Sequence, residues 1–150
     1  MSRFIYFGLL AIATLIVPFA GCGSGVKLVP VSGTVTVAGE PVEGITVTFL
    51  PKNQIEGEHM VPYGQTDAEG KFTVQVSPSQ MGAPAGEYTV LFQKLRMPDG
   101  SMIPEDQSAA DVGAVNQIPD MYMNPGPASE TVTIPEGGSQ NLTFDLKAKR

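Results

Sequence analysis

The sequence predicts an all-β protein in which seven short strands form a sandwich of two sheets. Three observations carry this prediction. Apolar residues alternate with polar ones along six separate stretches, so that each of these strands has one face toward a core, and a seventh, shorter strand is expected over residues 61–66. The 17 Gly and 13 Pro residues are typical of a turn-rich all-β chain, and most prolines after residue 28 fall at strand ends or in loops. No window after the first 21 residues shows a helical period.

The first two strands illustrate the pattern. Val35 alternates with Thr34 and Thr36, and the same alternation recurs in five of the other expected strands. The turns between strands are equally readable: residues 38–41 join the first two strands, and residues 67–70, Asp-Ala-Glu-Gly, predict a tight hairpin between the third and fourth. The expected strands cover residues 31–37, 45–49, 61–66, 71–76, 87–93, 131–134 and 141–147.

The first 21 residues predict a lipoprotein signal peptide. Arg3 precedes an apolar run over residues 4–17, which is too short for a comfortable transmembrane helix. Ala20 and Gly21 then precede Cys22, and these three residues resemble the lipobox of bacterial lipoproteins. In those proteins cleavage falls directly before the cysteine, here between Gly21 and Cys22. The cysteine then carries a diacylglyceryl anchor of palmitate type.

The expected organisation follows from that cleavage point. Residues 1–21 are the signal peptide, residues 22–28 the lipidated cysteine and a short linker, and residues 29–150 the sandwich domain. Gly23 stands where the inner-membrane retention signal of enteric bacteria has Asp, which favours the outer membrane. Two alternatives stay open: an ordinary cleaved signal that leaves a free thiol, and an uncleaved anchor.

Several motifs carry a family resemblance. Residues 31–35 read Val-Ser-Gly-Thr-Val, residues 39–47 Gly-Glu-Pro-Val-Glu-Gly-Ile-Thr-Val, residues 66–72 Thr-Asp-Ala-Glu-Gly-Lys-Phe, and residues 86–88 Gly-Glu-Tyr. In this order they resemble carboxypeptidase regulatory-like domains. The resemblance implies a transthyretin-like (prealbumin-like, Ig-like) β-sandwich, and it carries no catalytic residue set to map onto this chain.

The C-terminal part resembles small lipoproteins of the planctomycete type. Residues 118–125 read Ile-Pro-Asp-Met-Tyr-Met-Asn-Pro and precede the last two expected strands. In the resembling proteins a short Cys-Gly linker precedes the first strand, and a Tyr-x-Asp/Asn-Pro segment precedes the last two strands. The resemblance covers residues 22–150 and implies an exported, anchored location.

The composition excludes several functions. A net charge of −6 argues against a nucleic-acid partner, because phosphate binding needs a basic face. The single Cys excludes an internal disulfide, and the single His leaves little for a histidine-based site. The chain has no Gly-x-Ser-x-Gly elbow, and Glu56 and Glu58 lie in a polar loop that would not raise a carboxyl pKa. We therefore expect no enzyme activity, no cofactor and no metal.

The long irregular segment over residues 95–117 is the candidate ligand loop. Its four carboxylates would bind a divalent cation or a cationic polymer, or the segment is simply a solvated insertion. A copper site is the other metal alternative, because His59 and six scattered methionines supply soft ligands. The candidate ligand residues are Asp99, Glu105, Asp106 and Asp111.

These observations predict a lipid-anchored cell-envelope sandwich with a non-catalytic structural or binding role. Its partners would be the membrane lipid, through Cys22, and another envelope protein or a surface polysaccharide. The alternative function is a metal-binding or small-ligand-binding lipoprotein that uses the loop carboxylates or the methionines.

Overall fold

The computed structural model describes residues 26–53 and 60–149. The predicted signal peptide, the Gly21–Cys22 cleavage point, Glu56, Glu58 and His59 lie outside these ranges. Within them, no helix is long and apolar enough to cross a bilayer.

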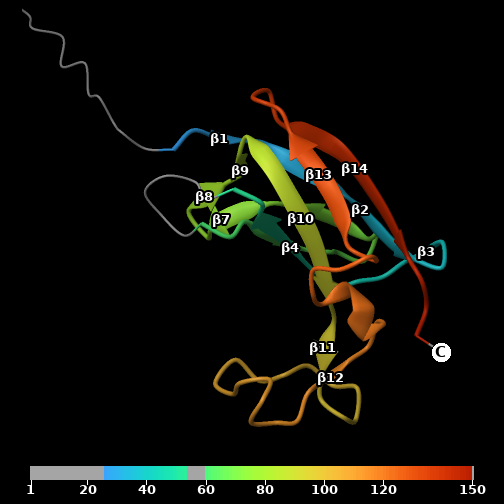
Figure 1. Cartoon of the computed structure of the whole chain (residues 1–150). Coiled ribbons are helices and arrows are strands. Elements are labelled where there is room, and N and C mark those ends of the chain that lie inside the picture. Colours follow the sequence, from blue (N-terminus) through green and yellow to red (C-terminus); the bar gives the residue numbers. More distant parts are fainter. Residues whose placement is uncertain (1–25, 54–59, 150) are drawn as a thin grey trace, which may run out of the picture.

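Two sheets form the body of the molecule (Figure 1). The larger has six strands in the order β13-β10-β4-β5-β7-β8, and the smaller contains β14, β2, β3 and β6. All pairings are antiparallel except that of β14 with β2, which is parallel. The strands of these sheets are β2 (Val31–Val37), β3 (Glu40–Pro41), β4 (Thr46–Pro51), β5 (Tyr63–Gln65), β6 (Lys71–Thr73), β7 (Gln75–Ser77), β8 (Gln80–Met81), β10 (Gly86–Gln93), β13 (Glu130–Ile134) and β14 (Ser139–Leu146).

Smaller elements lie at the two ends of the sandwich. A two-stranded ladder joins β1 (Leu28–Val29) to β9 (Ala83–Pro84), and another joins β11 (Leu95–Arg96) to β12 (Val115–Asn116). A single turn of 3-10 helix, η1 (Asp120–Tyr122), precedes β13. The first strand, β1, starts at Leu28, the last residue of the expected linker.

The predicted all-β sandwich is confirmed, and every expected strand is present. The two sheets contain ten strands rather than the expected seven, because β3 and β8 are additional and the fourth expected strand forms two. The expected fourth strand is split at Val74 into β6 and β7, which belong to different sheets. The prediction of a hairpin over residues 67–70 is wrong in one respect. The turn forms, with the Gly70 N–H donating to the Asp67 carbonyl at 2.9 Å, but it connects β5 of the larger sheet to β6 of the smaller one. Sequence alternation identifies a strand, whereas its partner is chosen by contacts far along the chain.

A chain of aromatic rings fills the space between the sheets. Phe49 packs edge-on against Tyr88 at 6.0 Å between ring centroids and lies 6.3 Å from Phe72. Phe144 continues the chain, stacked on Phe72 at 6.2 Å and edge-on to Phe92 at 5.1 Å. These five side chains come from both sheets and are all buried, so they hold the two layers together.

The buried phenol of Tyr88 is satisfied locally. Its hydroxyl donates a 2.8 Å hydrogen bond to the carbonyl of Pro84, at the start of the same stretch of chain. Burial raises the pKa of Tyr88 to about 12, so the phenol stays protonated and keeps this bond across the physiological range.

The parallel pairing of β14 with β2 explains the glycine in the Val-x-Gly-x-Val motif. Gly33 pairs with Leu142 of β14, and a Cβ atom at residue 33 would overlap the Leu142 carbonyl oxygen. Any larger residue would therefore push β14 off the sheet.

Thr66 joins two of the places where the chain passes from one sheet to the other. Its hydroxyl accepts from the Ile45 N–H at 2.9 Å and donates to the Val42 carbonyl at 2.6 Å. Its own backbone accepts from the Gly44 N–H and donates to the Ile45 carbonyl, both at 2.9 Å. Residues 42–45 lead from β3 to β4, and Thr66 begins the return from β5 to β6. The side chain is 3% exposed, so these bonds are protected from water.

We expect Thr66→Val to lower the free energy of unfolding by about 2–3 kcal/mol. Valine keeps the shape but leaves the Ile45 N–H and the Val42 carbonyl buried without partners. Thr73→Val, at an exposed position of β6, is the matched control and should change stability by no more than about 0.5 kcal/mol. Urea unfolding of both variants tests this, and equal midpoints would contradict it.

Candidate binding surfaces

Residues 95–117, called the arm below, project from one end of the sandwich (Figure 1). The arm begins and ends in the short ladder of β11 and β12, in which Leu95 pairs with Asn116. The Gln117 N–H closes the base of the arm by donating to the Lys94 carbonyl at 2.8 Å. The arm is thus a continuation of β10 and leaves the body in a defined direction.

Asn116 is the residue that fixes the base of the arm. Its side chain is 6% exposed, and its Oδ1 accepts a 2.8 Å hydrogen bond from the Lys94 N–H. Its Nδ2 lies 3.5 Å from the Asp120 carboxylate, and its backbone carbonyl accepts from the Lys149 Nζ at 2.8 Å. Through its side chain and its backbone carbonyl, this one buried residue therefore connects the end of β10, the turn of η1 and the C-terminal segment.

Basic groups stand next to this base. Burial lowers the pKa of Lys94, and the neighbouring Arg96 lowers it further, while Glu43 acts in the opposite direction. The Arg96 guanidinium packs against Gly44, whose missing side chain leaves room for it. The contact ties the start of the arm to the same crossover that Thr66 holds.

Local turns organise the acidic part of the arm. The carboxylate of Asp99 accepts from the Ser101 N–H at 2.9 Å and from its hydroxyl at 2.6 Å. These two bonds hold the pKa of Asp99 below its ordinary value. The Asp111 carboxylate accepts from the Ser108 hydroxyl at 2.6 Å in a second turn. Both carboxylates thus stabilise the arm itself.

The four predicted ligand residues do not form a cation site. Asp99, Glu105, Asp106 and Asp111 are all exposed, and the described part of the chain contains no group of three His, Cys, Asp or Glu side chains placed to hold a metal. Calcium needs six to eight oxygen ligands, which separated turns do not supply. The methionines are also dispersed: Met81 lies on β8, Met102 in the arm and Met121 in η1.

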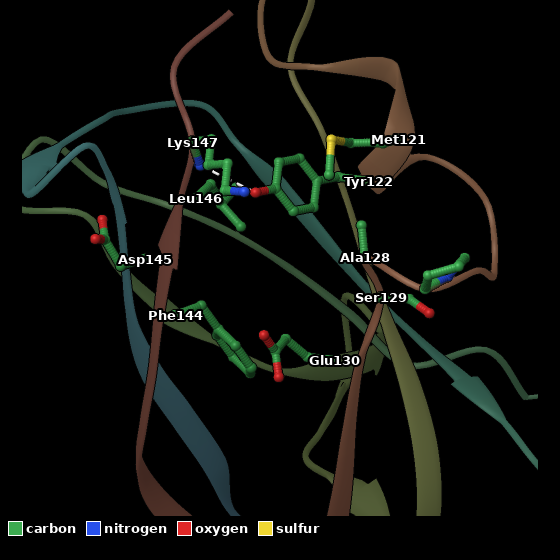
Figure 2. A pocket seen from close by; sticks show the side chains of 10 residues that line it. Met121, Tyr122, Ala128, Ser129, Glu130, Phe144, Asp145, Leu146 and Lys147 are labelled. Carbon is green, nitrogen blue, oxygen red and sulfur yellow. Dashed lines mark hydrogen bonds between the residues drawn. The ribbon is translucent and has the colours of Figure 1, made fainter.

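A groove of about 470 Å³ opens between β13 and β14 (Figure 2). Phe144 and Leu146 of β14 and Tyr122 of η1 form its apolar floor, and each is less than 7% exposed. The carboxylate of Glu130 lies across from Phe144, at the β13 side of the groove. The Tyr122 hydroxyl closes one end by accepting a 3.0 Å hydrogen bond from the Lys147 N–H.

The arm and the N-terminal strand leave the sandwich at opposite ends (Figure 1). β9, the partner of β1, immediately precedes β10, whereas β11 immediately follows it. The eight residues of β10 therefore separate the two ends, a distance of about 26 Å at 3.3 Å per residue.

Comparison with known proteins assigns no family. No family model and no curated protein matches the chain. Among solved structures, the major pilin subunit BcpA of Bacillus cereus is similar over 82% of this chain and 31% of its own, with 13% identity and a TM-score of 0.43. A 9R-lipoxygenase from Cyanothece PCC8801 is similar over 81% of this chain and 16% of its own, with 13% identity and a TM-score of 0.37. The chain spans less than a third of either structure.

Two residues of these surfaces have roles that the sequence did not reveal. Tyr122 belongs to the Tyr-x-Asn-Pro segment, yet nothing local indicates that its hydroxyl reaches Lys147, 25 residues later. No motif of the sequence includes Asn116, and the only local indication of its burial is the apolar Ile118 two residues later.

We expect Asn116→Ala to loosen the arm. The variant removes the acceptor of the Lys94 N–H at a buried position, which costs about 1–3 kcal/mol. Cleavage by a Glu-specific protease after Glu105, an exposed residue of the arm, should therefore accelerate by about tenfold if 1.4 kcal/mol acts on arm opening. Asn124→Ala, at an exposed loop position, serves as the control and should be cleaved at the unchanged rate. Identical rates for both variants would contradict the role given to Asn116.

Proposed function

We propose that the chain is a lipid-anchored cell-envelope protein with a non-catalytic binding role, which holds its arm away from the membrane. The observation that supports this best is the placement of the arm and of β1 at opposite ends of β10 (Figure 1). An acyl anchor at Cys22 lies six residues before Leu28, the first residue of β1. The anchored end of the sandwich then faces the bilayer, and the arm faces away from it.

The arm has the features of a presented surface. It is ordered by its own turns and by Asn116, so a partner meets a preformed shape and little ordering entropy is lost on binding. Met102 is 72% exposed, so the arm presents one apolar side chain that a partner can contact. The four exposed carboxylates of the arm favour a partner with a cationic surface, such as an envelope protein.

The carboxypeptidase regulatory-like resemblance supports the same role. Its two turn motifs meet at Thr66, where the glycine-rich turn of residues 39–47 contacts the Thr-Asp-x-x-Gly turn. We propose that the chain is a module of that kind, in which the motifs build the sandwich and the arm is the variable part that selects a partner.

Energy transfer on vesicles tests the anchor and the orientation together. The full chain, processed by a bacterial host, is labelled with a fluorescent donor at Met102→Cys or at Lys27→Cys and bound to vesicles with acceptor lipids. We expect energy transfer to the acceptor lipids to be several-fold weaker from a donor at residue 102 than from one at residue 27. The reason is that residue 102 lies farther from the bilayer by about the length of β10.

The Cys22→Ser variant is the control for the anchor. Combined with either labelled position, it should lose the mass of the acyl chains and its retention on the vesicles. Equal transfer from the two positions would contradict the orientation. Unchanged mass and retention after Cys22→Ser would contradict the lipid anchor.

A further inference from the structure

The sandwich has an open side where β13 and β14 lie next to each other without pairing. In the described part of the chain, β13 pairs with β10 alone and β14 with β2 alone, so each is an edge strand. A turn over residues 135–138 connects them although they belong to different sheets. The groove of Figure 2 lies between the two edges.

The free backbone groups of β14 can be assigned from its bonds to β2. The Leu146 carbonyl accepts from the Ala38 N–H at 2.7 Å, and the Phe144 carbonyl lies 3.4 Å from the Thr36 hydroxyl. Even-numbered residues at this end of β14 thus point their backbone groups at β2. Because successive residues of a strand point in opposite directions, the N–H and C=O groups of Thr143 and Asp145 point out of the sheet edge.

The same reasoning applies to β13. The Lys52 N–H donates to the Glu87 carbonyl at 3.0 Å, so odd-numbered residues of β10 point toward β4. Even-numbered residues of β10 then point toward β13, where Tyr88 pairs with Val132. The backbone groups of Thr131 and Thr133 are left pointing outward. Both edges of the open side therefore carry free donors and acceptors.

The usual devices that block an edge strand are weak on β14. Its eight residues include no proline and no lysine, and the carboxylate of its one charged residue, Asp145, lies on the β2 side of the strand (Figure 2). The Thr36 hydroxyl at 2.8 Å and the Gly39 N–H at 2.9 Å hold that carboxylate on the β2 side and keep the pKa of Asp145 low. Only the end of the strand is closed, where Tyr122 accepts from the Lys147 N–H.

The groove also offers side-chain contacts of defined chemistry. Phe144 at its floor belongs to the aromatic chain of the core, so an apolar side chain placed there would extend the core outward. The exposed carboxylate of Glu130 stands beside this position and favours a cation next to the apolar residue. A surface with free backbone groups at its edge, an apolar floor and one carboxylate is complementary to an extended peptide.

We propose that β14 accepts an added strand: an extended peptide segment of another protein, apolar at alternate residues, with a lysine or arginine facing Glu130. Its backbone bonds to Thr143 and Asp145, and one apolar side chain enters the groove over Phe144. This surface is separate from the arm, and the proposal holds whether or not Cys22 carries a lipid.

Selection from a phage-displayed library of random twelve-residue peptides tests the proposal on the full chain in detergent. We expect enriched peptides with alternating apolar residues and a basic residue. Synthetic copies should bind Thr143→Pro at least tenfold more weakly, because proline removes the outward N–H at a position where a sheet edge tolerates it. Thr143→Val keeps that N–H and should bind within twofold of the unaltered chain. Glu130→Lys should weaken binding at least fivefold.

A second measurement keeps the test independent of the proline variant's folding. Hydrogen exchange of the Thr143 and Asp145 amides in the unaltered chain should slow at least tenfold when the selected peptide is added. Failure to enrich any peptide would overturn the proposal. So would peptides that leave these amides unprotected, or peptides that bind folded Thr143→Pro and the unaltered chain equally.

Discussion

The hydrogen bonds of Thr66 are the constraint on which the rest of the fold depends. The chain passes from the smaller sheet to the larger through residues 42–45 and returns after β5, and one buried side chain joins both passages. Gly70 completes the return, because its carbonyl accepts from the Val35 N–H at 2.8 Å. Because both of these crossovers are fixed at this side, β2 and β4 lie in opposite layers. The aromatic side chains between the layers then pack in a single arrangement.

The opposite side of the sandwich has no such closure. In the described part of the chain, β13 pairs only with β10, and β14 pairs only with β2. A turn of four residues connects β13 to β14. The layers are sealed there by single contacts, such as Tyr122 against Phe92 at 6.2 Å and the bond from Lys147 to the Tyr122 hydroxyl. One side thus stabilises the fold, and the other leaves edges and a groove available for binding. Functional surfaces often lie in this less constrained part of a domain.

The sequence predicted what local chemistry decides. Alternation located the main strands, and Asp67 with Gly70 located a tight turn, because side-chain capping and a positive φ of 72° at Gly70 are local requirements. It did not predict that β5 and β6 lie in different sheets, since their partners β4 and β2 are distant in sequence. For a related reason, the sequence could not show whether the four arm carboxylates meet at one site. Asp99 and Asp111 bind the serines of their own turns, so each turn closes on itself. Asn116 and Tyr122 act on Lys94 and Lys147, and no pattern in one sequence connects residues that far apart.

The central claim is that the sandwich is closed at the Thr66 side and open at the β14 edge. Native-state hydrogen exchange of the unliganded chain measures both sides at once. The amides of Ile45 and Thr66 should exchange only through global unfolding, whereas those of Thr131, Thr143 and Asp145 should exchange within the fastest class of strand amides. If the amides of Thr143 and Asp145 are as protected as that of Thr66, the β14 edge is already paired and the claim is wrong.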